Sequence, residues 1–312
     1  MKIYRYNDYP LELHGIPFFE KTGELYRLPP EITDKIETLS HCGRRSSGAR
    51  LCFRTDAAEF TVRMSLKTLS FDIGLSIYAC QSAHVLVGDR NDAEFLGHVR
   101  PDNYENKQFQ RTFKKSNKME DVTIFLPRNE VVENIEIVVD EAARVESPTP
   151  YKDIKPILYY GPSITEAGNC MTGFTAYPAI ISARLNIDVY NMGFAGCALG
   201  EAEVAEYIKN IEMSMFVYEY EYNAPTVEHL ENTHKPFFDI IRKANPTLPI
   251  LITTFQNINI TMMIMPDGML LKELMILRFQ TETSTFIFSM VRILSAQKTV
   301  CYALWMKFTQ TI

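Results

Sequence analysis

The second half of the sequence alternates short apolar runs with helical patterns, and this alternation is what most restricts the fold. The apolar runs cover residues 157–160, 187–190, 214–218 and 249–253, and helical periodicity covers 177–185, 201–209 and 227–244. Continuous apolar runs of this length are typical of strands that are buried on both faces of a parallel sheet. The sequence therefore predicts a parallel βα sheet, in which ligands bind beyond the carboxyl ends of the strands.

The first half has a different pattern, because apolar and polar residues alternate with period two. The clearest runs are 59–64, 71–77, 121–127 and 134–139, with turn-forming Pro, Asn and Asp between them. Such alternation predicts half-buried strands, and many short strands in succession favour an antiparallel β-sandwich of jelly-roll type. We expect this domain to cover residues 1–150, with a linker at 148–156 and an α/β domain over 151–255.

Size and charge narrow the class of protein. A chain of 312 residues with 46% hydrophobic content can form two packed cores. A net charge of −6 without clustered Lys and Arg argues against a nucleic-acid partner. Neither a signal peptide nor an apolar run of about 20 residues occurs, so we expect no membrane partner and a cytoplasmic location. Oligomeric state is left open.

The six cysteines stand singly, without the paired spacing of a zinc site or the density of a disulfide framework: Cys42, Cys52, Cys80, Cys170, Cys197 and Cys301. We interpret them as reduced and mostly buried, with Cys197 a small buried residue beside Gly196. No metal is expected.

Three strand-end segments carry the candidate chemistry. The first, Tyr159–Gly168, runs from an apolar strand into a small-residue turn that presents Ser163. The others are Asn191–Gly196 and Tyr218–Pro225, which follow the next two strands. A serine becomes a useful nucleophile when a base takes its proton and donors stabilise the oxyanion. The alternative for a single serine after a strand is a helix N-cap.

Serine, glycine and asparagine on successive strand ends resemble the first three blocks of the SGNH (GDSL-type) esterase and acylhydrolase family over residues 155–255. The resemblance implies a flavodoxin-like domain, here truncated, with no cofactor. It implies that Ser163 is the nucleophile and that the oxyanion hole consists of the Ser163 and Gly196 N–H groups and the Asn223 amide. One departure is Pro162, which stands where the family has aspartate and removes an N–H.

The family's base and its orienting carboxylate, an Asp-x-x-His block near the C-terminus, are absent, because no histidine follows His234. His229 and His234 lie inside the helical pattern 227–244, and we expect surface or packing roles for both. Glu219 and Glu221 are two residues apart at a strand end, so both could face the cleft. A solvated strand end is the alternative.

After Phe255 the sequence no longer fits this fold, and the genetic code offers a reason. Reading from the third base of each codon, Trp305 and Met306 force aspartate, and the following codons allow Glu-Val-His-Pro. Met262-Met263-Ile264 likewise forces two aspartates in that frame. We therefore predict a frameshift between about residues 254 and 262, which makes 256–312 an aberrant tail. A divergent but authentic tail is the alternative.

The resemblance implies ester hydrolysis by acyl transfer through Ser163. Similarity to two-domain carbohydrate esterases favours a short acyl group, such as acetyl, on a sugar. Without the Asp-x-x-His block, we expect this chain to be impaired. An acyltransferase on the same fold and a non-catalytic glycan-binding protein are the alternatives.

Overall fold

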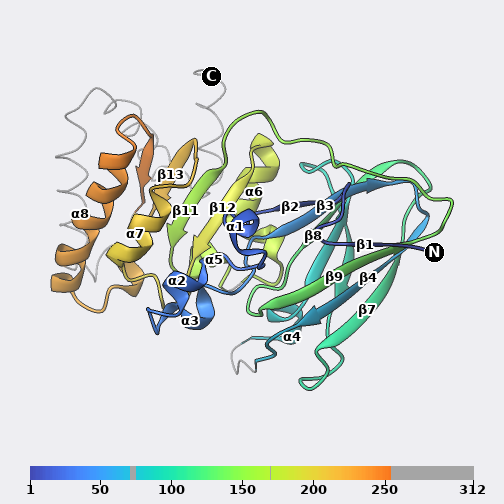
Figure 1. The fold of residues 1–312 in the computed structure, drawn as a ribbon, viewed down its shortest axis with the longest axis horizontal. Helices are drawn as coiled ribbons and strands as arrows, with labels where there is room; N and C mark the ends of the chain where they lie inside the picture. The colour runs from blue at the N-terminus through green and yellow to red at the C-terminus, as the bar shows by residue number, and fades with distance from the viewer. Residues whose placement is uncertain (71–74, 169, 254–312) are drawn as a thin grey trace, which may run out of the picture.

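The computed structural model describes residues 1–70, 75–168 and 170–253, which form a β-rich part and an α/β part that lie side by side (Figure 1). The β-rich part has two antiparallel sheets. One contains β1 (Lys2–Arg5), β9 (Val132–Val139), β4 (Glu59–Leu66) and β7 (Gln108–Lys114), in that order. The other has the order β10 (Val145–Glu146), β3 (Arg50–Thr55), β8 (Glu120–Phe125), β5 (Ala83–Val87) and β6 (Glu94–Val99), with β2 (Glu12–His14) also paired to β3.

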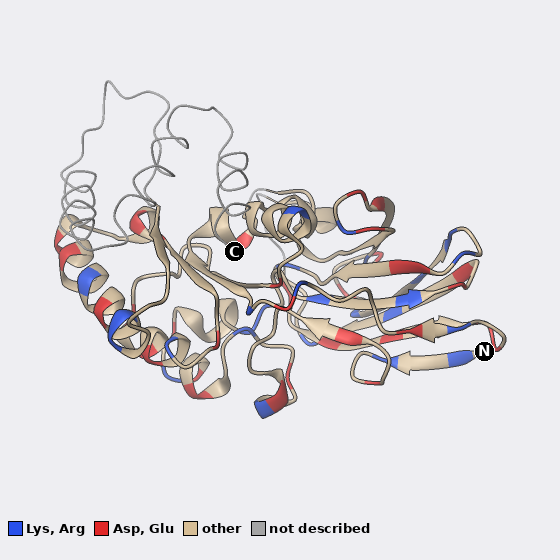
Figure 2. Ribbon diagram, turned by 90° about the horizontal axis from the view of Figure 1, so that it is seen from above, with Lys and Arg blue, Asp and Glu red and all other residues tan. Residues whose placement is uncertain are grey.

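The period-two alternation explains how these sheets pack. Along β4, Phe60, Val62 and Met64 are buried while Glu59 and Arg63 are exposed. The buried side chains join those of both sheets in one apolar cluster, which fills the space between them. Figure 2 shows Lys and Arg interspersed with Asp and Glu along the strands and along α8, as expected for faces that meet water.

The predicted strand at 71–77 lies mostly outside the described residues. Its described end, 75–77, contains no strand, because α4 (Ile77–Cys80) begins at the last residue of the run. A helical turn there buries Ala79 and Cys80, and the Cys80 carbonyl accepts a hydrogen bond from the Asn129 N–H at 3.1 Å. The alternation was too short to distinguish a strand from a buried helical turn.

The α/β part has the parallel sheet that the sequence predicts. Its strands follow the order β12 (Val189–Gly193), β11 (Ile157–Gly161), β13 (Met215–Tyr218) and β14 (Ile250–Ile252). The helices α7 (Ala202–Ile208) and α8 (Val227–Ala244) cover one face, and α6 (Tyr177–Leu185) covers the other. The short helical turns α5 (Ser163–Glu166) and η2 (Glu221–Asn223) follow β11 and β13, and η1 (Gly173–Thr175) lies between α5 and α6. Residues 148–156, the predicted linker, contain no helix or strand.

The N-terminal part also contributes to the α/β core. Between β2 and β3 lie α1 (Phe19–Thr22), α2 (Pro30–Thr33) and α3 (Leu39–Cys42), and the last two lie next to α5 in Figure 1. Leu28, Ile32 and Leu39 belong to the same buried cluster as the side chains of α7 and α8. The predicted domain boundary at residue 150 therefore stays a proposal. Side chains from before this residue pack in the same core as side chains from after it.

Candidate active site

Ser163 is the first residue of α5, immediately after strand β11. Pro162, in extended conformation, is the N-cap of this helix, so Ser163 does not have the capping role that was its structural alternative. The side chain is half-buried, and its hydroxyl makes no hydrogen bond within the described part of the chain. Its N–H, at the first helical position, lies where α-helices have no intrahelical acceptor. Among the described residues, neither group has a hydrogen-bond partner.

Glycines let α5 pack tightly against the strand ends. A Cβ on Gly193 would lie 2.3 Å from the Glu166 nitrogen, and one on Gly168 would lie 2.7 Å from the Ser163 Cβ. Ala167 ends the helix with a positive φ of 84°, a conformation that is strained for a residue with a side chain. The helix thus ends after a single turn, and the chain returns past Ser163.

The segments that carry Gly196 and Asn223 are joined by a hydrogen bond. The Asn223 Nδ2 donates to the Phe194 carbonyl at 3.1 Å, and the Phe194 N–H donates to the Gly161 carbonyl at 2.9 Å. Gly196 is exposed, with a positive φ of 72°. An amide nitrogen has two hydrogens, so Asn223 keeps one for a ligand. That Ser163, Gly196 and Asn223 all face a single cleft stays a prediction.

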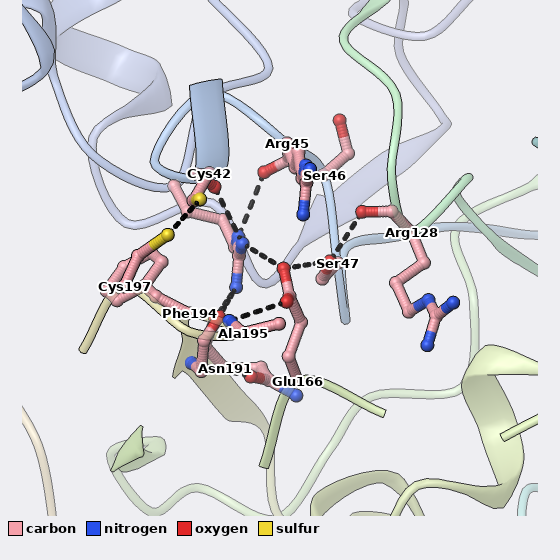
Figure 3. A network of polar contacts seen from close by, with 12 residues as sticks. Cys42, Arg45, Ser46, Ser47, Arg128, Glu166, Asn191, Phe194, Ala195 and Cys197 are labelled. Atoms are coloured by element: carbon pink, nitrogen blue, oxygen red, sulfur yellow. Dashed lines mark hydrogen bonds and ion pairs between the residues drawn. The ribbon is translucent and has the colours of Figure 1, made fainter. Parts of the chain in front are cut away.

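A buried ion pair connects the turn that carries Ser163 to the N-terminal part (Figure 3). Glu166, three residues after Ser163, is 1% exposed, and its Oε1 accepts from Arg27 Nη2 at 2.7 Å. Its Oε2 accepts from the Ala195 N–H at 2.9 Å. One carboxylate therefore links α5 to the loop that contains Gly196.

Arg27 completes this network with backbone contacts. Its guanidinium donates to the carbonyls of Arg45 and Cys42, and to those of Asn191 and Gly193 in β12. The Ser47 hydroxyl is 3.1 Å from Glu166 Oε1. Sequence reasoning missed these residues. Glu166 could have been noticed as a carboxylate three residues after Ser163. Arg27 could not, because it lies 139 positions from Glu166 in the sequence.

The two histidines of α8, His229 and His234, contact residues other than Ser163. His234 is 1% exposed and its ring lies against those of Tyr218 and Tyr220, with centroid distances of 4.5 and 5.7 Å. The His229 Nε2 is 2.7 Å from the Leu199 carbonyl. Both contacts agree with the packing roles expected from the sequence.

Glu219 follows β13 and is mostly buried rather than solvated. Its N–H donates to the Tyr160 carbonyl at 3.0 Å, which places its backbone beside the end of β11. Burial and the neighbouring Glu221 carboxylate raise the pKa of Glu219 to about 7. Glu219 therefore keeps its proton to a higher pH than an ordinary glutamate does.

The described residues offer no arrangement of three or more His, Cys, Asp or Glu side chains that could hold a metal ion. Within the same residues, no helix is long and apolar enough to cross a membrane. The predicted aberrant tail, 256–312, lies outside the described residues. The expected position of the Asp-x-x-His block falls in the same segment.

Two family models match the chain. Residues 1–145 match the model described as the N-terminus of esterases of the SGNH-hydrolase type, and residues 154–273 match the GDSL-like lipase/acylhydrolase family. The chain belongs to the SGNH (GDSL-type) hydrolase family. Residues 274–312 of this SGNH hydrolase lie outside both matches. A comparison with curated proteins gave no match.

Solved structures share the fold. A protein from Bacteroides ovatus described as a GDSL-like lipase has 19% identity and a TM-score of 0.72, over 80% of this chain and 73% of that one. A salicylyl-acyltransferase from a tetracycline biosynthetic pathway has 18% identity and a TM-score of 0.66, over 80% and 71%. A family two carbohydrate esterase from Cellvibrio japonicus has 11% identity and a TM-score of 0.57, over 89% and 85%.

Proposed function

We propose that this SGNH hydrolase is built as a serine esterase, with Ser163 as its nucleophile. The observation that supports this most is the hydrogen bond from Asn223 to the Phe194 carbonyl. It joins the loops after β12 and β13, next to the turn from which Ser163 extends. Nucleophile and oxyanion donors must be held together in this way before a substrate arrives.

In the proposed reaction, the Ser163 Oγ attacks the ester carbonyl carbon and its proton passes to a base. The negative charge that develops on the carbonyl oxygen is stabilised by the N–H groups of Ser163 and Gly196 and by the second hydrogen of the Asn223 amide. The alcohol leaves, and water then hydrolyses the acyl-enzyme. The chemistry requires no metal or organic cofactor.

The general base that this reaction needs is missing from the sequence as given, because no histidine follows His234. The histidines of α8 have other contacts, and none of these contacts reaches Ser163. The shifted reading of the tail allows the sequence Asp-Glu-Val-His-Pro. We propose that a frameshift removed this block, and that turnover is reduced on the order of 10⁴ to 10⁶, the scale of triad removal.

For the substrate, we propose a short acyl group on a carbohydrate, with support from the fold shared with the Cellvibrio japonicus carbohydrate esterase. Acyl transfer to another acceptor is the second candidate. The similarity in fold to the salicylyl-acyltransferase favours it. The third candidate is a non-catalytic protein, in which the β-sandwich binds a glycan and no ester is hydrolysed. Fold similarity alone does not choose among these functions.

A repair experiment tests the proposal. Sequencing the encoding DNA around codons 250–265 locates the shift, and the chain as written is then compared with one whose frame is restored near codon 258. We expect little hydrolysis of p-nitrophenyl acetate or acetylated sugars by the first, and clear hydrolysis by the second.

Ser163→Ala and substitution of the restored histidine should each abolish the recovered activity. If the restored chain folds but hydrolyses no acetyl ester, the esterase proposal is wrong and transfer to added acceptors is assayed next. If the chain as written hydrolyses esters through Ser163, a base has been overlooked, and His229→Gln and His234→Gln identify it.

A further inference from the structure

Two thiols from distant parts of the sequence meet at the loop that carries Gly196 (Figure 3). Cys42 is the last residue of α3, and Cys197 follows Gly196 directly. Their Sγ atoms are 2.7 Å apart although the residues are separated by 155 positions. This separation is only about 0.7 Å longer than a disulfide bond. Bond formation therefore requires a small movement of the side chains.

Neighbouring contacts hold both cysteines in position. The Cys42 carbonyl accepts from Arg27 Nη2 at 2.8 Å, and its thiol contacts the Thr38 carbonyl at 3.4 Å. The Cys197 N–H donates to the Phe194 carbonyl at 3.0 Å. These hydrogen bonds hold the backbone of both cysteines, and so the two sulfur atoms stay close to each other.

The surroundings distinguish the two thiols. The hydrogen bond with Cys197 and the positive charges of Arg45 and Arg27 lower the pKa of Cys42 to about 7, against the opposite effect of burial. The same hydrogen bond, with burial, raises the pKa of Cys197. Cys42 is therefore the thiolate of the pair, and thiolates are the nucleophiles in cysteine oxidation. Because Cys42 is only 6% exposed, a small oxidant suits it.

We propose that Cys42 and Cys197 form an oxidative modification site, at which hydrogen peroxide converts the thiol pair into a reversible disulfide. The Cys42 thiolate attacks one peroxide oxygen, the O–O bond breaks, and Cys42 sulfenic acid and hydroxide form. The Cys197 sulfur then attacks the Cys42 sulfur, and its proton leaves with the sulfenic oxygen as water. Two thiols lose two electrons in total, and one peroxide becomes two waters.

The disulfide would tie the loop at residues 194–200 to α3. That loop carries the N–H of Gly196, so oxidation would restrict a proposed oxyanion donor. This consequence rests on the proposed esterase function, whereas the disulfide does not. The two are therefore tested separately, and the disulfide assay requires no ester hydrolysis.

The experiment treats the reduced full-length protein with a small molar excess of hydrogen peroxide. Samples are quenched with an alkylating reagent at successive times and analysed as peptides by mass spectrometry. We expect a cross-linked peptide pair joining Cys42 to Cys197, with both thiols lost at one rate and about ten-fold faster than Cys170, a half-buried cysteine. Dithiothreitol should restore both thiols.

Two variants make the result decisive. In Cys197→Ser, Cys42 should stop at sulfenic acid and be trapped by dimedone, whereas the matched control Cys170→Ser should form the cross-link as the parent does. A parent protein in which Cys42 and Cys170 oxidise at equal rates without a cross-linked pair overturns the proposal. A cross-link that forms only between molecules, with a rate that depends on protein concentration, overturns it as well.

Discussion

At the scale of single residues, Glu219 shows how position changes the behaviour of a carboxyl group. Burial and Glu221 raise its pKa to about 7, from an ordinary value of 4.5. The folded protein therefore holds this proton more tightly than the unfolded chain does. As the pH rises from about 4.5 to 7, the unfolded carboxyl ionises first, and the free energy of unfolding decreases.

Glu219→Gln should remove this pH dependence, because glutamine stays neutral. We expect the variant to match the parent near pH 4 and to be more stable at pH 8, by up to about 3 kcal/mol. Urea unfolding at several pH values measures the difference, with the exposed Glu203→Gln as the control. A difference between variant and parent that does not change with pH would contradict the raised pKa.

The same scale shows what a sequence can and cannot predict about a site. Ser163, Gly196 and Asn223 could be proposed from the sequence because each follows a strand, and the ends of parallel strands lie at one edge of the sheet. The Arg27–Glu166 pair could not, because it depends on contact between distant segments. No local pattern marks an arginine that will be buried by a strand more than a hundred residues later.

At the scale of elements, α5 depends on the glycines that flank it. The element positions in the α/β part could be predicted because buried strands and amphipathic helices have different periods. The single turn of α5 could not, since four residues carry too little pattern. Its place is determined by close approach to β12 at Gly193 instead.

Gly193→Ala should therefore destabilise the protein more than Gly196→Ala. At Gly193 a methyl group would overlap the backbone of Glu166, at 2.3 Å, and α5 would have to move. We expect a loss of more than about 2 kcal/mol there. At Gly196 there is open space, so only the positive φ costs energy, roughly 1 to 2 kcal/mol. Thermal and urea unfolding of both variants compare these costs, and equal losses would contradict the tight packing of α5.

At the scale of the whole molecule, the two parts are joined by charge as well as by apolar contact. Asp188 at the start of β12 pairs with Arg50 of β3 and lies 2.9 Å from the His14 ring of β2. Leu86 and Phe125 of the sandwich pack against Ala167, Ala176 and Ala179. The sequence predicts both parts but not the interface between them. Alternation of apolar and polar residues shows that a strand has two different faces, but it does not show which other segment packs against each face.

The Arg27–Glu166 pair measures how strongly the two parts depend on each other. Arg27→Met leaves a buried carboxylate without its cation, which costs about 3 to 5 kcal/mol. In Arg27→Met/Glu166→Gln neither charge remains, so we expect the double variant to lose less than the sum of the two single losses. Urea unfolding followed by far-UV circular dichroism and by tyrosine fluorescence gives the four free energies of the cycle.

The Lys155–Glu212 pair provides the control, since its N–O distance is also 2.7 Å but its side chains are 60% and 77% exposed. Lys155→Met should leave the free energy of unfolding almost unchanged, because water screens an exposed ion pair. If Arg27→Met does not fold while the double variant does, the coupling is stronger still. Additive losses in the Arg27 cycle, equal in size to those of the control, would mean that water reaches Glu166. The N-terminal part would then not hold the Ser163 turn in place.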